Sequence, residues 1–134
     1  MANALYPKWK EQLLQFTTNN NLSAGTVKVA LVDTGVYTYN AADQFYSSVT
    51  AAAVGTPQTL GTKTFTNGVF DAADVTFTAV TGASVEALVI YIDTGTAATS
   101  PLVAYIDTSV TGLPVTPNGG NIAITWNVSG IFAL

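Results

Sequence analysis

Cysteine, histidine and arginine are all missing from this chain of 134 residues. Without cysteine there is no disulfide framework and no thiol nucleophile, and without cysteine and histidine the usual zinc ligands are missing. The Ser-His and Cys-His pairs of nucleophilic catalysis are excluded for the same reason. The lack of arginine excludes bidentate recognition of phosphates or carboxylates.

Charge is also scarce, because only 9% of the residues are charged, against about 25% in an ordinary domain. Four lysines and eight acids give a net charge of −4, and residues 64–134 contain no basic residue. This balance offers no basic patch to a phosphate backbone, so we expect no nucleic-acid partner. A weakly charged chain that is 49% hydrophobic is easily covered by another protein, which favours a role in an assembly. A neutral soluble monomer is the alternative.

Membrane and export segments are not expected either. The longest apolar run, residues 87–92, is far shorter than the roughly 20 residues of a membrane-spanning helix. The first ten residues have no apolar core of the kind that signal peptides contain. We therefore expect no membrane partner.

One helix is predicted near the N-terminus. Pro7 suits a first helical position, where its missing N–H group costs nothing. An apolar stripe at helical spacing is formed by Leu5, Trp9, Leu13 and Phe16. The polar run 17–21 should end this helix, because its side chains compete for backbone hydrogen bonds. A second, short helix is predicted over residues 41–48, with Asn40 as its N-cap.

Most of the remaining chain has the pattern of short β-strands. Alternating apolar and polar residues predict half-buried strands at 27–31, 74–80 and 121–128. Residues 85–92 and 102–106 are apolar on both faces, which predicts central strands covered on both sides. The second cover would be the N-terminal helix or a neighbouring subunit.

Turn signals complete this pattern at Asn67-Gly68, Thr81-Gly82 and 117–120. Frequent turns between short strands predict an antiparallel β-sandwich or jelly-roll-like barrel with one N-terminal α-helix. The length suits a single domain, 1–134, made of an N-terminal helix or arm at 1–21 and a β domain at 26–134.

The sharpest enzymatic signal is the tripeptide Asp-Thr-Gly, at residues 33–35 and 93–95. Aspartic proteases use it after an apolar strand, where two carboxylates share one proton. The looser third copy, Asp107-Thr108-Ser109, favours ordinary turns in which the aspartate bonds to its own backbone. Val36 and Thr96 also stand where the proteases have a small residue. We expect no catalytic residues and keep an aspartic-type protease as a remote alternative.

Two other groups of residues carry weak signals. Asp71 and Asp74 offer oxygen ligands, but two acids are too few for a calcium loop, so we expect no metal and no cofactor. Aromatic residues gather at 37–39 and 45–46. They suit a core or a contact with a partner better than a sugar site.

Five segments carry a resemblance to a known group of proteins: residues 2–8, 66–72, 74–82, 86–95 and 111–120. Together they resemble small virion structural proteins of tailed bacteriophages, and the likeness spans essentially the whole chain. The resemblance implies a component of the phage particle, located in the virion and assembled in the host cytoplasm. It brings no catalytic motif.

Among such proteins, small β proteins are often capsid cement or decoration proteins. They bind the outside of the shell as trimers and stabilise contacts between capsomers. The resemblance therefore implies the major capsid protein as partner. A tail, neck or fibre component, with other tail or neck proteins as partners, is the alternative.

Self-association is expected as well, because two-faced apolar strands leave a surface that one small domain can hardly cover. We predict a homo-oligomer, with a trimer as the first choice. The predicted assembly contacts lie in the N-terminal segment: Leu5, Tyr6, Lys8, Trp9, Lys10, Leu13 and Phe16. Large apolar anchors beside polar groups are typical of interface hot spots. The alternative is that the helix covers the protein's own sheet.

Overall fold

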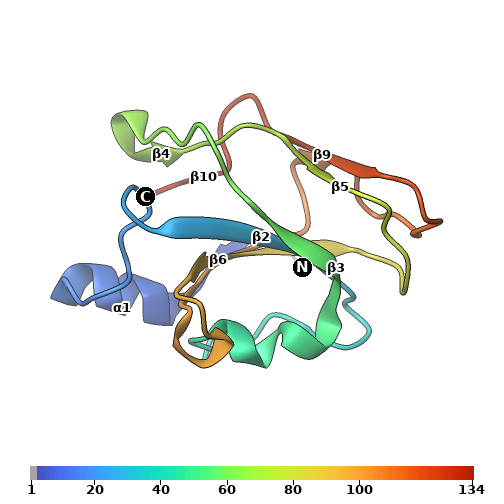
Figure 1. Cartoon of the computed structure of the whole chain (residues 1–134). Coiled ribbons are helices and arrows are strands. Elements are labelled where there is room, and N and C mark those ends of the chain that lie inside the picture. The colour runs from blue at the N-terminus through green and yellow to red at the C-terminus, as the bar shows by residue number, and fades with distance from the viewer. Residues whose placement is uncertain (1–2) are drawn as a thin grey trace.

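The computed structural model describes residues 3–134, and it confirms a mainly antiparallel β fold in which the described chain has one α-helix (Figure 1). In chain order the elements are β1 (Ala4–Leu5), α1 (Pro7–Gln15), β2 (Thr26–Val32), β3 (Ala53–Thr59), β4 (Val69–Phe70), β5 (Val75–Phe77), β6 (Ala87–Asp93), β7 (Leu102–Ile106), β8 (Val110–Thr111), β9 (Ile122–Trp126) and β10 (Phe132–Ala133).

The strands form a sandwich-like arrangement. The main sheet has the order β1-β7-β6-β2-β3, a smaller sheet has the order β5-β9-β8, and β10 pairs with β4. Every one of these pairings is antiparallel. In Figure 1, β5 and β9 lie above β2 and β6 of the main sheet, and the segment before β3 lies below them. The main sheet is therefore covered on both sides.

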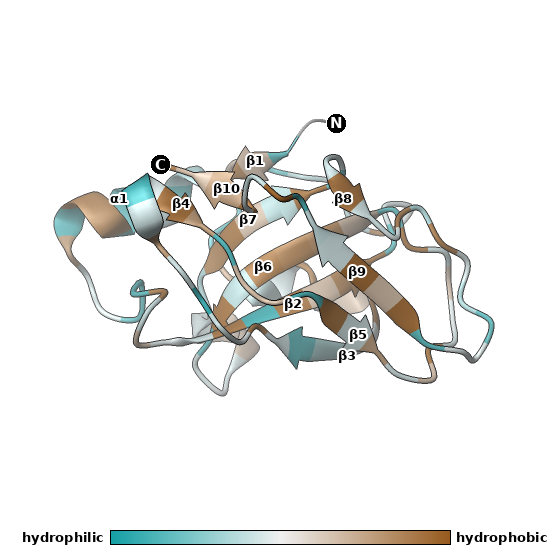
Figure 2. Cartoon of the chain, turned by 90° about the horizontal axis from the view of Figure 1, so that it is seen from above, coloured by the Kyte–Doolittle hydropathy of each residue, from teal (hydrophilic) through white to brown (hydrophobic). Residues whose placement is uncertain are grey.

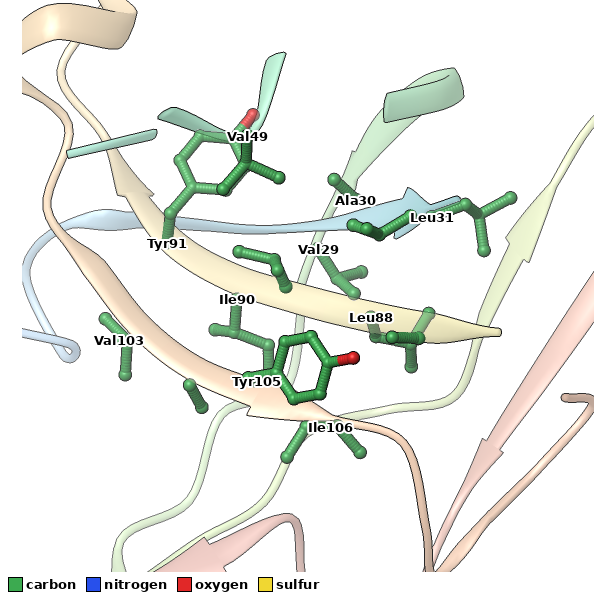
Figure 3. Packing of buried hydrophobic residues seen from close by; sticks show 14 of the residues in the cluster. Val29, Ala30, Leu31, Val49, Leu88, Ile90, Tyr91, Val103, Tyr105 and Ile106 are labelled. Atoms are coloured by element: carbon green, nitrogen blue, oxygen red, sulfur yellow. The ribbon is translucent and has the colours of Figure 1, made fainter. Parts of the chain in front are cut away.

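The central strands are buried as their sequences predict. All of β7 and all but the last residue of β6 are buried, and β9 alternates strictly between buried and exposed positions. Figure 3 shows the apolar side chains of β2, β6 and β7 packed in neighbouring rows, among them Val29, Leu88 and Ile106. Burial of these side chains supplies the main driving force for folding.

The lower face of the main sheet carries a layer of aromatic rings. The six tyrosines of the chain contribute to the core or pack against it: Tyr6, Tyr37, Tyr39, Tyr46, Tyr91 and Tyr105. Tyr46 stacks on Tyr91 with ring centroids 3.8 Å apart, and Tyr39 lies 5.7 Å from Tyr105. The second cover of the central strands thus includes residues 37–52 of the same chain. The aromatic residues at 37–39 and at 46 belong to this layer.

The predicted second helix over residues 41–48 is wrong. The Asn40 side chain accepts a hydrogen bond from the Ala42 N–H at 3.0 Å, which makes a turn. Phe45 is extended and forms a bridge with Pro101, and beside it Gln44 O accepts from Leu102 N at 2.9 Å and Tyr46 N donates to Ser100 O at 2.8 Å. Helical structure is limited to 3₁₀ turns at Tyr46–Ser48 and Thr50–Ala52. Pairing beside β7 replaces the local helical hydrogen bonds.

The turn at Asn67-Gly68 is confirmed, but the expected hairpin is short. Both residues have positive φ, 56° and 76°, as a tight hairpin turn requires. Thr64 and Asp71 exchange two backbone hydrogen bonds of 2.9 and 3.1 Å. Within the loop that this bridge closes, β4 pairs with β10 near the C-terminus, so residues 65–70 do not pair with one another as hairpin strands. The turn near Gly82 joins β5 to β6, which lie in different sheets.

Candidate assembly surface

The seven predicted contact residues differ widely in exposure. Tyr6 and Trp9 are buried, with 0% and 1% of their surface exposed. Leu5, Lys8 and Leu13 are half-buried, and Lys10 and Phe16 are exposed. Leu5 does not lie on the helix, because it pairs with Ala104 of β7 as part of β1.

Trp9 fixes α1 to the rest of the molecule. Its indole N–H donates to the Asn20 carbonyl at 3.4 Å, and its ring meets Phe132 edge-on with centroids 5.8 Å apart. Because Trp9 is buried within its own chain, the helix covers part of this protein's own fold. This was one of the two alternatives for the N-terminal segment.

A side-chain clip also holds the N-terminal arm in place. The Asn3 Oδ1 accepts from the backbone N–H groups of Asp107 and Thr108 at 2.7 and 2.9 Å. The Asn3 Nδ2 donates to the Thr108 carbonyl at 2.9 Å. Together with the pairing of β1 and β7, these bonds attach the arm to the edge of the main sheet.

The C-terminal end of α1 is closed by the residues that follow it. Phe16 adopts the left-handed conformation, with φ of 57° and ψ of 42°, and Thr17 N donates to Gln12 O at 3.1 Å. The Asn20 side-chain amide donates to the same carbonyl at 2.6 Å. Carbonyls at a helix end need such partners, so the polar run 17–21 ends the helix as predicted. The consequence is an outward-pointing Phe16, 95% exposed.

An apolar groove of about 480 Å³ lies beside this end of α1. We call it the α1 groove and define it by its apolar lining residues: Trp9, Leu13, Phe16, Leu22, Phe65 and Leu134. Threonine, asparagine and serine side chains from residues 17–23 form its polar rim, and no charged side chain is among its lining residues in the described part of the chain. Figure 2 shows α1 near β4 and the C-terminus, with a brown, apolar stretch in the helix.

Rings beneath the groove hold its far wall. Phe65 packs on Phe70 with centroids 5.6 Å apart, and Phe70 packs on Phe132 at 5.2 Å. The Leu134 N–H donates to the Gly68 carbonyl at 3.0 Å, which fixes the last residue beside the Asn67-Gly68 turn. The groove therefore lies between α1 on one side and, on the other, Phe65 just before β4 and Leu134 just after β10.

The lysines of α1 do not belong to this groove. Lys8 forms an ion pair with Glu11 at 3.1 Å, and both line a separate polar cleft of about 430 Å³ with Gln12, Gln44 and Phe45. The predicted combination of apolar anchors and cations is thus divided between two neighbouring surfaces.

The aspartates of the Asp-Thr-Gly repeats make turns. The carboxylates of Asp33 and Asp93 accept from the N–H groups of Gly35 and Gly95 at 2.8 and 2.9 Å, which confirms their bonding to local backbone. Since Thr26 pairs with Asp93 and Val32 with Ala87, the two aspartates lie at opposite ends of β2 and β6. At about 3.4 Å per residue they are roughly 20 Å apart, so one chain cannot pair them.

Asp71 and Asp74, the two acids considered as metal ligands, also accept backbone hydrogen bonds. The carboxylate of Asp71 accepts from Ala72 N at 2.9 Å, and that of Asp74 accepts from Trp126 N at 2.9 Å. Across residues 3–134, no three potential metal ligands of the Asp, Glu, His or Cys type come together. In the same described range, no helix has the length and apolar character needed to span a membrane.

Comparison with known proteins adds no relative. No protein-family model matches this sequence. No curated protein matches it significantly. The resemblance to phage virion proteins therefore rests on the five sequence segments given above.

Sequence reasoning missed three apolar lining residues of the α1 groove: Leu22, Phe65 and Leu134. Phe65 and Leu134 form the far wall of the groove, and Leu14, which does not line the groove, was also not predicted and is 89% exposed. Leu14 lies outside the apolar stripe of the helix. This position in the sequence pattern could have predicted an exposed apolar side chain. The pairing of β4 with β10 brings Phe65 and Leu134 to the groove. No local sequence pattern predicts that pairing.

Proposed function

We propose that this chain is a non-enzymatic structural subunit of a tailed-phage particle. The observation that carries the proposal is the α1 groove, whose lining has no charged side chain in the described chain and includes Phe16 at 95% exposure. Contiguous exposed apolar surface of this kind marks interaction sites on soluble proteins. The low charge of the whole chain and the resemblance of its sequence segments to virion proteins support the same proposal.

Within the particle we propose a capsid cement or decoration role. In this role the protein binds the major capsid protein on the outside of the shell, as a homotrimer, and stabilises contacts between capsomers. The covered central strands and the tied N-terminal arm make a rigid unit, which suits a clamp. A tail, neck or fibre component is the alternative role.

Binding to separated particle parts tests this role. Purified full-length protein is mixed with isolated heads lacking it and, separately, with isolated tails, and each mixture is sedimented. The proposal predicts that the protein sediments with heads up to a saturating amount. Sedimentation with tails alone would favour the alternative, and sedimentation with neither would contradict a particle role.

The absence of catalysis is part of the proposal and has its own test. The double variant Asp33→Asn, Asp93→Asn removes both carboxylates that a protease dyad would need. Because the two lie at opposite ends of β2 and β6 and bond to local backbone, we expect particle assembly and precursor cleavage to continue. A folded double variant that blocks cleavage of a capsid precursor would contradict the structural role.

A further inference from the structure

Two asparagines of this chain are followed directly by glycine, in the pairs Asn67-Gly68 and Asn118-Gly119. In such a pair the backbone nitrogen of the glycine can attack the side-chain carbonyl carbon of the asparagine, because glycine has no side chain to hinder the close approach. Both asparagines are exposed to solvent. Sequence and exposure therefore do not distinguish the two sites, and a difference in reactivity must come from how the fold holds each turn.

The turn at Asn118-Gly119 is held by hydrogen bonds on both of the groups that would react. The Gly119 N–H donates to the Val80 carbonyl at 2.8 Å, and the Val80 N–H donates to the Gly120 carbonyl at 3.0 Å. The Asn118 Oδ1 accepts from the Gly120 N–H at 2.9 Å. The attacking nitrogen is thus bonded to a distant part of the chain, and the side chain is bonded within its own turn.

The turn at Asn67-Gly68 is held more weakly. Within the described residues the Asn67 side chain makes no hydrogen bond, and the Gly68 N–H donates to the Phe65 carbonyl at 3.3 Å, beyond the usual range of about 2.7–3.2 Å. Its long-range tie is the bond from the Leu134 N–H to the Gly68 carbonyl at 3.0 Å, beside the two-residue pairing of β10 with β4. Short pairings of this kind open at a low cost in free energy.

Reaction at Asn67 requires its turn to open briefly. Asn67 has φ of 56° and ψ of 31°, which places the Gly68 nitrogen on the far side of the Cα–C bond from the side chain. Asparagine holds this left-handed conformation as a single residue supported by its turn. Each net hydrogen bond that must break lowers the population of an open turn several-fold. Because the Asn118 turn has more and shorter bonds to break, its open form is the rarer of the two.

We propose that Asn67 is a site of spontaneous deamidation in the folded protein and that the fold protects Asn118. The Gly68 nitrogen gives its proton to solvent and forms a bond to the Asn67 Cγ, and the side-chain nitrogen takes up one proton and leaves as ammonia. One water molecule then opens the five-membered imide at either carbonyl, which gives aspartate or isoaspartate at position 67. Atoms and charge balance with water as the only co-reactant, and no oxidant or reductant takes part.

Either product places a new carboxylate in the turn that holds Leu134. Because Leu134 is a wall of the α1 groove, the modification brings negative charge to the neighbourhood of a surface whose described lining residues carry none. It also makes the net charge of the chain, −4, more negative. Conversion of Asn67 therefore changes the apolar surface without any change in the gene.

Peptide mapping of the full-length protein tests the proposal. The protein is kept in mildly alkaline buffer, and samples taken over days are cleaved before aspartate residues, which places Asn67 in peptide 43–70 and Asn118 in peptide 107–134. Mass spectrometry follows the mass gained when the side-chain NH₂ becomes OH, and fragmentation assigns it to a residue. An additional cut before position 67 marks the aspartate product, which isoaspartate resists. We expect conversion at Asn67 to be roughly tenfold faster than at Asn118, or more.

The unfolded chain is the matched control, because it keeps both Asn-Gly pairs and removes the fold. In urea concentrated enough to unfold the protein, the two sites should convert at similar rates. Equal rates in the folded protein, faster conversion at Asn118, or an Asn67 that stays intact while the unfolded chain reacts would overturn the proposal. A preference for Asn67 that persists unchanged in urea would overturn it too, because local sequence rather than the fold would then set the difference.

Discussion

Lys63 is the residue that holds the connection between α1 and β2. Its ammonium group donates to the carbonyls of Leu22, Ser23 and Gly25 at 2.7, 3.3 and 2.8 Å. The side chain thereby closes a turn whose carbonyls converge on one point. Leu22 of this turn also lines the α1 groove, so Lys63 supports the proposed contact indirectly.

Replacing this lysine should destabilise the protein. Hydrogen bonds to a charged group contribute roughly 1.5–3 kcal/mol, so Lys63→Met is expected to lower the free energy of unfolding by about that amount. Urea unfolding followed by circular dichroism measures the change. Lys10→Met, at an exposed position on α1, is the control and should cost less than about 0.5 kcal/mol. Equal effects of the two variants would contradict the assigned role of Lys63.

The ion pair of Asp93 with Lys28 should make the stability of the protein depend on pH. Lys28, 2.8 Å away, and then the N–H of Gly95 hold the pKa of the Asp93 carboxyl below its ordinary value of 3.8. The charged form is favoured in the folded state, so its stabilisation is complete above that ordinary value. It is lost as the pH falls through the lowered pKa. Since both side chains are partly exposed, the contribution should not exceed about 1 kcal/mol.

The variant Asp93→Asn isolates this contribution. Unfolding free energies of wild type and variant are compared by urea titration at steps from pH 7 down to pH 2.5. The wild type should be more stable near neutrality, and the difference should shrink at the acid end. A difference that does not change with pH would show that the ion pair does not produce it.

At the scale of elements, one face of α1 is part of the core, whereas the C-terminal end of the helix is exposed to solvent. Trp9 is 1% exposed, whereas Phe16 is 95% exposed. Trp9→Ala should therefore cost about 3–5 kcal/mol of unfolding free energy, and Phe16→Ser should change it by less than about 0.5 kcal/mol. Urea unfolding of both variants checks this, and a large loss in Phe16→Ser would mean that the ring belongs to the core.

Deleting residues 1–16 also tests whether the N-terminal segment is part of the folded core. The deletion removes Tyr6 and Trp9, both buried, and exposes the edge of β7 that β1 pairs with. We expect the truncated protein to unfold or precipitate. A truncated protein that folds normally would show that the N-terminal segment is an independent arm.

The predictability of the elements follows from how local their causes are. The position of α1 could be predicted from Pro7 and the polar run 17–21. The strands β6 and β7 could be predicted from runs that are apolar on both faces. Each of these signals lies within the segment whose structure it determines. The edge strand β3 contains Gly55 and Pro57, residues that are unfavourable in strands, and long-range pairing with β2 holds it. The short β10 is likewise fixed by β4.

The candidate surface was predictable in part for the same reason. Phe16 was expected as a contact and is exposed, but Tyr6 and Trp9 were expected beside it and are buried. Periodicity identifies large apolar residues on one helix face without telling whether the core or a partner covers them. Phe65 and Leu134 come together through tertiary structure, which no short segment encodes.

At the scale of the whole molecule, its own chain covers both faces of the main sheet. The segment before β3, which contributes Tyr37, Tyr39 and Tyr46, lies on one side of the main sheet, and β5 and β9 lie on the other (Figure 1). The two-faced strands therefore do not themselves require a partner subunit. The proposed association depends instead on the low charge of the chain and on the exposed apolar residues at one end of α1.

Quantitative mass spectrometry of purified phage particles tests the proposed particle role most directly. The amount of this protein is measured relative to the major capsid protein in heads and in complete particles. A capsid cement or decoration role predicts a copy number close to that of the major capsid protein. A few tens of copies or fewer would contradict the cement role in favour of the tail, neck or fibre, and absence from mature particles would contradict the structural role itself.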